Sequence, residues 1–172
     1  SASTALYQII NQKVNITTPV VSITTLKEIK ETFETPTVVL DVEYTSGIIG
    51  RNILIIKTED AAVIANLMMG GDGIVENHEL SEIEISAVQE AMNQMIGSAA
   101  TSMATMFSRE VNISPPISKI WSNSEDALSS EIPEDQAIVR VNFRMTIGNL
   151  VDSNIMQILP VETAKKIVSI MI

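Results

Sequence analysis

The chain has 172 residues, of which 45% are hydrophobic, enough to bury one sizeable core in a single domain. Its formal net charge of −10 disfavours binding to nucleic-acid phosphates and anchoring to an anionic membrane surface. There is no cysteine and one histidine, His78, so the sequence supplies no disulfide and no multi-histidine metal site. No apolar run approaches the roughly 20 residues of a membrane-spanning helix, and direct membrane insertion is not expected.

The sequence contains an internal repeat. Residues 1–19 resemble residues 98–116 without a gap, and the similarity continues downstream. A chain with only two copies of a repeat is not a solenoid, so the two copies are expected to be halves that share one core. We therefore predict a single domain over residues 1–172, with one repeat over about 1–73 and the other over about 80–172.

Each half is predicted to run from a helix through a strand, a short connection and two more strands to a final helix. In the first half, residues 37–44 and 53–56 are rich in β-branched and apolar side chains and predict a hairpin. In the second half, residues 138–147 and 151–159 flank a Gly-Asn turn pair and predict another. The predicted fold class is α/β with pseudo-two-fold symmetry, in which two α-β-β-β-α repeats share a largely antiparallel sheet with long helices packed on it.

A long central helix is predicted to begin beside Ser81. This residue can cap the helix, and Glu84 can reciprocate three positions later, which is the pattern of a capping box. The helix can continue to about Phe107. One face carries apolar side chains at helical spacing, which we assign to the core: Val88, Met92, Met95, Ala99, Met103 and Met106.

A narrow polar line occupies the opposite face of this predicted helix. Ser86, Glu90, Asn93 and Gly97 fall within a sector of roughly 60° at 100° per residue. A solvated face of an amphipathic helix would look the same. Residues 91–106 contain no charged side chain, however, which indicates a largely covered helix with a small exposed window. Gly97 indicates close approach by a neighbour, either another part of the chain or a partner.

The spacing Ser86-x3-Glu90-x2-Asn93-x22-Pro116 resembles the D/S-x3-E-x2-N-x22-P motif of the CheC, CheX and FliY phosphatases. The resemblance covers essentially the whole chain, is strongest to the middle domain of the FliY members, and implies a CheC-like fold. Counting back from Pro19 by the same spacing places the first repeat's glutamate and asparagine before residue 1. The resemblance therefore implies that the first repeat is truncated at its N-terminus.

The resemblance also implies a function, because this family acts on phosphorylated CheY, the response regulator of flagellar rotation. It implies that Asn93 orients the attacking water and that Glu90 pairs with a lysine of the regulator. Ser86 and Pro116 would be supporting residues. The domain would have no cofactor of its own, since the regulator supplies Mg²⁺. The implied location is the cytoplasm, at the cytoplasmic face of the flagellar basal body.

A non-enzymatic rotor module is the alternative interpretation. The run Gly70-Gly71-Asp72-Gly73 resembles the GGxG loop through which the related FliM middle domain contacts FliG. The partners would then be FliG and other flagellar switch proteins. Glycines between two helices also make an ordinary flexible connector. FliM-type domains lack the glutamate and asparagine pair, so the intact motif at Glu90 and Asn93 favours the phosphatase.

Overall fold

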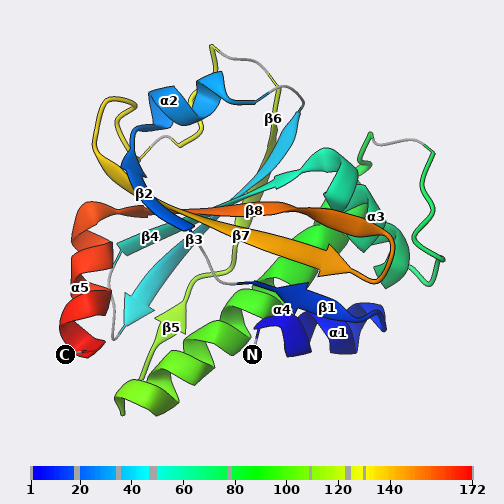
Figure 1. The fold of residues 1–172 in the computed structure, drawn as a ribbon, viewed down its shortest axis with the longest axis horizontal. Helices are drawn as coiled ribbons and strands as arrows, with labels where there is room; N and C mark the ends of the chain where they lie inside the picture. The colour runs from blue at the N-terminus through cyan, green and yellow to red at the C-terminus, as the bar shows by residue number, and fades with distance from the viewer. Residues whose placement is uncertain are drawn as a thin grey trace.

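The computed structural model describes residues 2–17, 20–33, 36–46, 50–76, 79–108, 110–122, 125–129 and 131–171. Its strands form one eight-stranded sheet in which every pairing is antiparallel (Figure 1). The strands are β1 (Val14–Ile16), β2 (Val20–Thr24), β3 (Thr37–Ser46), β4 (Gly50–Lys57), β5 (Asn112–Ile113), β6 (Ile117–Trp121), β7 (Ile138–Ile147) and β8 (Val151–Pro160). The helices are α1 (Ala2–Ile10), α2 (Leu26–Glu31), α3 (Thr58–Met68), α4 (Glu82–Phe107) and α5 (Val161–Met171). His78 lies outside the described residues.

The predicted α/β class with a shared antiparallel sheet is confirmed. The order of strands is β1-β7-β8-β4-β3-β5, with β2 also pairing β7 and β6 also pairing β3. The hairpins β3–β4 and β7–β8 thus meet at the centre of the sheet. The first strands of each half pair with the hairpin of the other half: β1 and β2 pair with β7, and β5 and β6 pair with β3. The single first strand expected in each half is instead two short segments, β1 with β2 and β5 with β6, and each pair of segments lies along one edge of the sheet.

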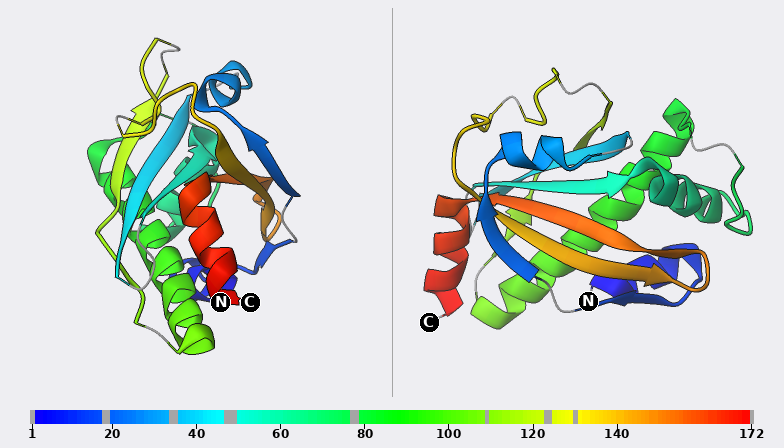
Figure 2. Two further views of the ribbon diagram at one scale, coloured as in Figure 1. Left: turned by 90° about the vertical axis from the view of Figure 1, so that its left-hand side faces the viewer. Right: turned by 45° about the horizontal axis from the view of Figure 1, so that its top comes forward.

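The two faces of the sheet carry separate hydrophobic clusters. On β4, Leu54 and Ile56 belong to a cluster with α1, α3 and α4, whereas Ile53 and Ile55 belong to a cluster with α2 and Trp121. This alternation is the two-residue period of a β-strand buried on both sides. As a result α2 and α4 lie on opposite sides of the sheet (Figures 1 and 2).

The long helix α4 begins with the predicted capping box. The Ser81 amide donates to Glu84 Oε1 at 3.1 Å, and the Glu84 amide donates to Ser81 Oγ at 3.3 Å. These bonds satisfy two of the donors that a helix leaves free at its start. Along the described part of the core face, Val88, Met92 and Met95 are buried as expected. In the described part of the chain, no helix has both the length and the apolar character needed to cross a membrane.

Candidate functional site

The predicted polar line lies on the solvent side of α4. Glu90 and Ser86 are exposed and Asn93 is half-buried, whereas their neighbours Ala91 and Met92 are almost fully buried. The helix therefore holds the Glu90 and Asn93 side chains one turn apart on its accessible face. Both are open to a partner, and the partial burial of Asn93 restricts its amide more than that of a fully exposed residue.

Glu90 is oriented by the following turn of the helix. Gln94 Nε2 donates a hydrogen bond of 3.0 Å to Glu90 Oε1, which is the i, i+4 spacing that brings two helical side chains together. The carboxylate is thereby held at one oxygen on the surface of α4. An exposed carboxylate held in this way can attract a cationic side chain of another protein.

Pro116 is connected to α4 through Gln89, a residue that the sequence motif does not include. Gln89 Nε2 donates to the Pro116 carbonyl at 2.7 Å, and Ser118 Oγ donates to Gln89 Oε1 at 2.6 Å. Pro116 itself is buried between β5 and β6. The Gln89 amide therefore fixes the connection after β5 against the helix, directly beside Glu90. Its position next to the motif was the only sequence signal for this role.

The Gln89 contacts predict a measurable loss of stability. Gln89→Ala leaves the Pro116 carbonyl and the Ser118 hydroxyl without this partner in a partly buried setting, and we expect a cost of about 1–3 kcal/mol. Gln94→Ala is the matched control, because its exposed amide makes one surface hydrogen bond, and its cost is expected to stay within about 0.5 kcal/mol. Urea unfolding of both variants measures the difference, and equal costs would contradict the bridging role.

Among the described residues, the structure leaves space beside Gly97 for a Cβ atom. A Cβ built on this residue meets no heavy atom within 4 Å among the described residues, leaving out the local helix backbone. The close approach that the sequence suggested is therefore not made by the described part of this chain. Among the described residues, this space continues the line of Glu90 and Asn93 by another turn of the helix.

The glycine loop after α3 is a hydrogen-bonded turn held by Asn66. The Gly71 amide donates to the Asn66 carbonyl at 2.9 Å, and the Gly73 amide donates to Asn66 Oδ1 at 2.7 Å. Gly70 and Gly73 have φ angles of +89° and +85°, which favour glycine. Gly70 and Gly71 are exposed and Gly73 is buried. The sequence did not single out Asn66, since an asparagine near the end of a helix is common.

Two exposed apolar residues flank this loop. Met69 and Ile74 are 60% and 72% exposed. The loop therefore presents accessible backbone between two apolar side chains.

In the described part of the chain, no group of three or more His, Cys, Asp or Glu side chains is arranged to hold a metal ion. The polar line of α4 offers one amide, one carboxylate and the hydroxyl of Ser86.

The fold matches the crystal structure of FliY from Thermotoga maritima. The TM-score is 0.90 and the sequence identity is 40%, over 99% of this chain and 87% of that chain. The chain belongs to the FliY family. The CheC-like family model matches residues 83–120 of this FliY-family domain. That segment contains the motif residues Ser86, Glu90, Asn93 and Pro116, and the match to FliY confirms the family expected from them.

A curated relative shares this similarity over part of its length. The domain is 47% identical over 169 residues to the flagellar motor switch phosphatase FliY of Bacillus subtilis (strain 168). The match covers 98% of this chain and 45% of that protein, so the chain spans about half the length of the curated relative that it matches. The middle domain of FliM from H. pylori has the same fold, with a TM-score of 0.76 at 17% identity over 98% of this chain and 88% of that chain.

Proposed function

We propose that this domain accelerates hydrolysis of the aspartyl phosphate of phosphorylated CheY at the flagellar switch, on the cytoplasmic face of the basal body. The observation that carries the proposal is the accessible pair Glu90 and Asn93 on one face of α4, in a chain of the FliY family. The B. subtilis relative, named a flagellar motor switch phosphatase, supports it. CheY would be the protein partner, and other switch proteins would surround it.

Asn93 is the residue assigned to the chemical step. An amide can donate a hydrogen bond to a phosphoryl oxygen through Nδ2 and accept one from water through Oδ1. It would thus hold the water in line with the bond between phosphorus and the aspartyl oxygen. The water oxygen attacks phosphorus, the aspartyl carboxylate leaves with the bonding electrons, and the water proton goes to the released phosphate. Positioning and charge stabilisation are the main requirements of phosphoryl transfer.

Glu90 is assigned to docking. Its exposed carboxylate, held by Gln94, would pair with a lysine of the regulator and place Asn93 beside the phosphoryl group. Ser86, one turn earlier, and Pro116, fixed by Gln89, would support the edges of the contact. The domain would add no cofactor of its own, because Mg²⁺ bound by the regulator would neutralise charge on the phosphate.

The docking role predicts a selective effect of one substitution. Glu90→Gln keeps the hydrogen bond to Gln94 but removes the charge, so the phosphorylated CheY concentration at half-maximal rate should rise about tenfold, or about 1.4 kcal/mol. The rate at saturation should change little, and the dependence on salt should weaken. Phosphate release measured over a range of regulator concentrations and ionic strengths tests this.

Glu82→Gln provides the matched control for Glu90→Gln. Glu82 is an exposed glutamate on the same helix, two turns before Glu90, and its replacement makes the same change in net charge. It should leave the half-saturating concentration nearly unchanged. If the two substitutions raise that concentration equally, Glu90 acts only through the general charge of the domain.

A second candidate function is contact with FliG through the loop at Gly70, Gly71 and Gly73. The observation that favours it is the turn fixed by Asn66 between the exposed side chains of Met69 and Ile74. A domain of the same fold occurs in a FliG–FliM complex from H. pylori, with a TM-score of 0.75 at 18% identity. Absence of phosphate release by the wild-type domain, together with binding to FliG, would establish this function instead.

A further inference from the structure

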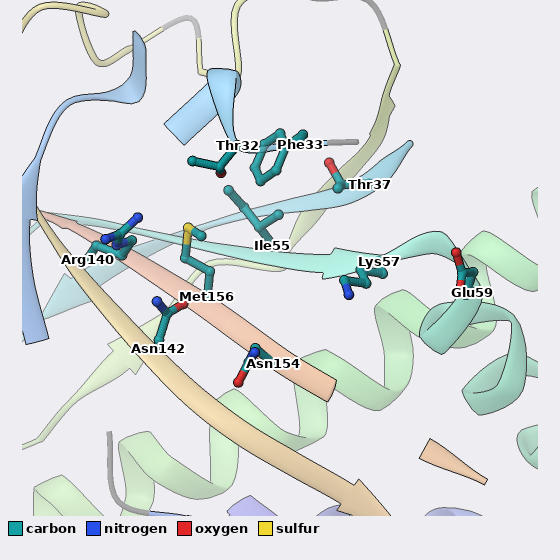
Figure 3. A pocket seen from close by; sticks show the side chains of 10 residues that line it. All are labelled: Thr32, Phe33, Thr37, Ile55, Lys57, Glu59, Arg140, Asn142, Asn154 and Met156. Atoms are coloured by element: carbon teal, nitrogen blue, oxygen red, sulfur yellow. The ribbon is translucent and has the colours of Figure 1, made fainter. Parts of the chain in front are cut away.

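A second accessible region lies on the face of the sheet opposite α4. It is a cavity of about 510 Å³ between the end of α2 and the strands β4, β7 and β8 (Figure 3). This volume is within the usual range of small-molecule sites. The cavity shares no lining residue with the polar line of α4, and its function is independent of the proposed phosphatase activity.

Two cations line this cavity in a chain whose net charge is −10. Arg140 Nε donates to Ser22 Oγ at 3.1 Å, and Lys57 is an exposed residue at the end of β4. In the part of the chain that the structure describes, neither cation has a carboxylate oxygen within 4 Å. Glu59 is the one carboxylate among the described lining residues. The cavity is therefore more cationic than the molecule as a whole.

The two cations lie at opposite ends of an apolar floor. Ile53 pairs with Ile158, which in turn pairs with Arg140, while Lys57 lies four residues farther along β4. At 3.3 Å per residue, the backbone of Lys57 is about 13 Å along the strand direction from the paired residues Ile53, Ile158 and Arg140. Figure 3 shows Ile55 and Met156 between Arg140 and Lys57, with Phe33 facing them from the end of α2.

Aromatic and polar residues complete the lining. Phe33 lies on one side of the cavity, where its ring makes an edge-on contact with Trp121, with ring centroids 5.2 Å apart. Asn142, the β7 partner of Met156, places an amide beside the apolar floor. At the Lys57 end lies Thr37, which pairs with Lys57 and is 3% exposed. Among the described residues, its Oγ1 has no hydrogen-bond partner. Because this oxygen is almost fully covered, it does not reach a ligand in the cavity.

We propose that this cavity binds an elongated organic dianion with an apolar middle. One anionic group, a carboxylate or phosphate, would lie on the free side of the Arg140 guanidinium, whose planar fork suits either group. The apolar middle would pack on Ile55, Met156 and Phe33. The second anionic group would accept a hydrogen bond from Lys57 at the other end of the cavity.

The test uses the 172-residue chain and three probes that separate length from charge. Suberate has eight carbons and a carboxylate at each end, succinate has the same charge on a shorter chain, and octanoate has the same length with one carboxylate. We expect suberate to bind at least about tenfold more tightly than either control, a factor equivalent to about 1.4 kcal/mol. A bisphosphate of similar length distinguishes phosphate from carboxylate ends. Methyl NMR shifts should map to Ile55 and Met156 during the titration.

Substitutions at Arg140 and Lys57 test whether each residue binds one anionic end of the ligand. Arg140→Met and Lys57→Met should each weaken suberate binding about tenfold, whereas Lys13→Met, an exposed lysine outside the cavity, should not. Thr37→Val is nearly isosteric and removes a covered hydroxyl that has no partner among the described residues, so it should leave both suberate binding and the fold unchanged. Urea unfolding confirms that each variant is folded. Equal binding of suberate and octanoate, shifts mapping elsewhere, or insensitivity to Arg140→Met and Lys57→Met would overturn the proposal.

Discussion

Replacing Asn93 with alanine is expected to lower the rate of CheY dephosphorylation at saturating regulator by about 10- to 1000-fold. The loss corresponds to about 1.4 to 4 kcal/mol of transition-state stabilisation, the usual cost of removing a group that orients water and stabilises developing charge. Alanine removes both the donor and the acceptor of the amide. Unlike Glu90→Gln, this substitution should change the saturated rate more than the half-saturating concentration of phosphorylated CheY.

The fold should survive the Asn93→Ala substitution. Asn93 is half-buried on α4, and alanine is the better helix former, so the change in unfolding free energy should stay within about 0.5 kcal/mol. Phosphate release at saturating regulator and urea unfolding on the same protein separate the two effects. Gln136→Ala removes an exposed amide from the segment before β7 and serves as the control. An Asn93→Ala protein as active as wild type would refute the proposed mechanism.

Gly50→Ala is expected to destabilise the domain by about 2–4 kcal/mol. Gly50 begins β4 with a φ of +149°, a conformation that residues with a Cβ rarely adopt. A Cβ there would lie 2.0 Å from Thr163 Oγ1 and 2.9 Å from Thr163 Cβ. Thr163 is a buried residue of α5 and has little room to move. Backbone strain and overlap with α5 therefore act together.

The same substitution at Gly97 is the matched control for Gly50→Ala. A Cβ at Gly97 meets no described atom outside the local helix backbone, and alanine favours the helix, so Gly97→Ala should stabilise the domain by about 0.5–1 kcal/mol. Chemical unfolding of both variants measures the contrast in sign. A further variant, Gly50→Ala with Thr163→Ala, should regain part of the loss because the hydroxyl overlap is removed. Similar unfolding free energies for the two single variants would contradict this account of Gly50.

Local signals in the sequence predicted the elements well. The capping box at Ser81 and Glu84 and the end of the helix near Phe107 depend on neighbours within a turn, and the structure has them where expected. The β7–β8 hairpin follows from two apolar runs and a short turn in the same way. The family followed from four spaced residues on and after α4, because that spacing is set by the helix and by the connection to β6.

Contacts between distant segments were not predictable from the sequence. Gln89 reaches from within α4 to Pro116 and Ser118, and nothing in the local pattern distinguishes it from any other polar helical residue. Arg140 and Lys57 come from different halves and share a cavity only because β8 lies between β4 and β7. The space that the described residues leave beside Gly97 also required the structure, since a glycine in a helix has several physical causes.

The exchange of edge strands between the two halves determines how this chain can fold. Val14 pairs with Ile147 and Thr37 pairs with Trp121, so each edge of the sheet closes only when segments far apart in sequence have met. Such non-local pairing gives a high contact order, and loop-closure entropy is lost before the pairing compensates for it. We therefore expect the transition state for folding to contain strands from both repeats, which substitutions in β1 and β6 would test through folding rates. On this expectation the two repeats fold together as one kinetic unit, without one serving as a preformed template for the other.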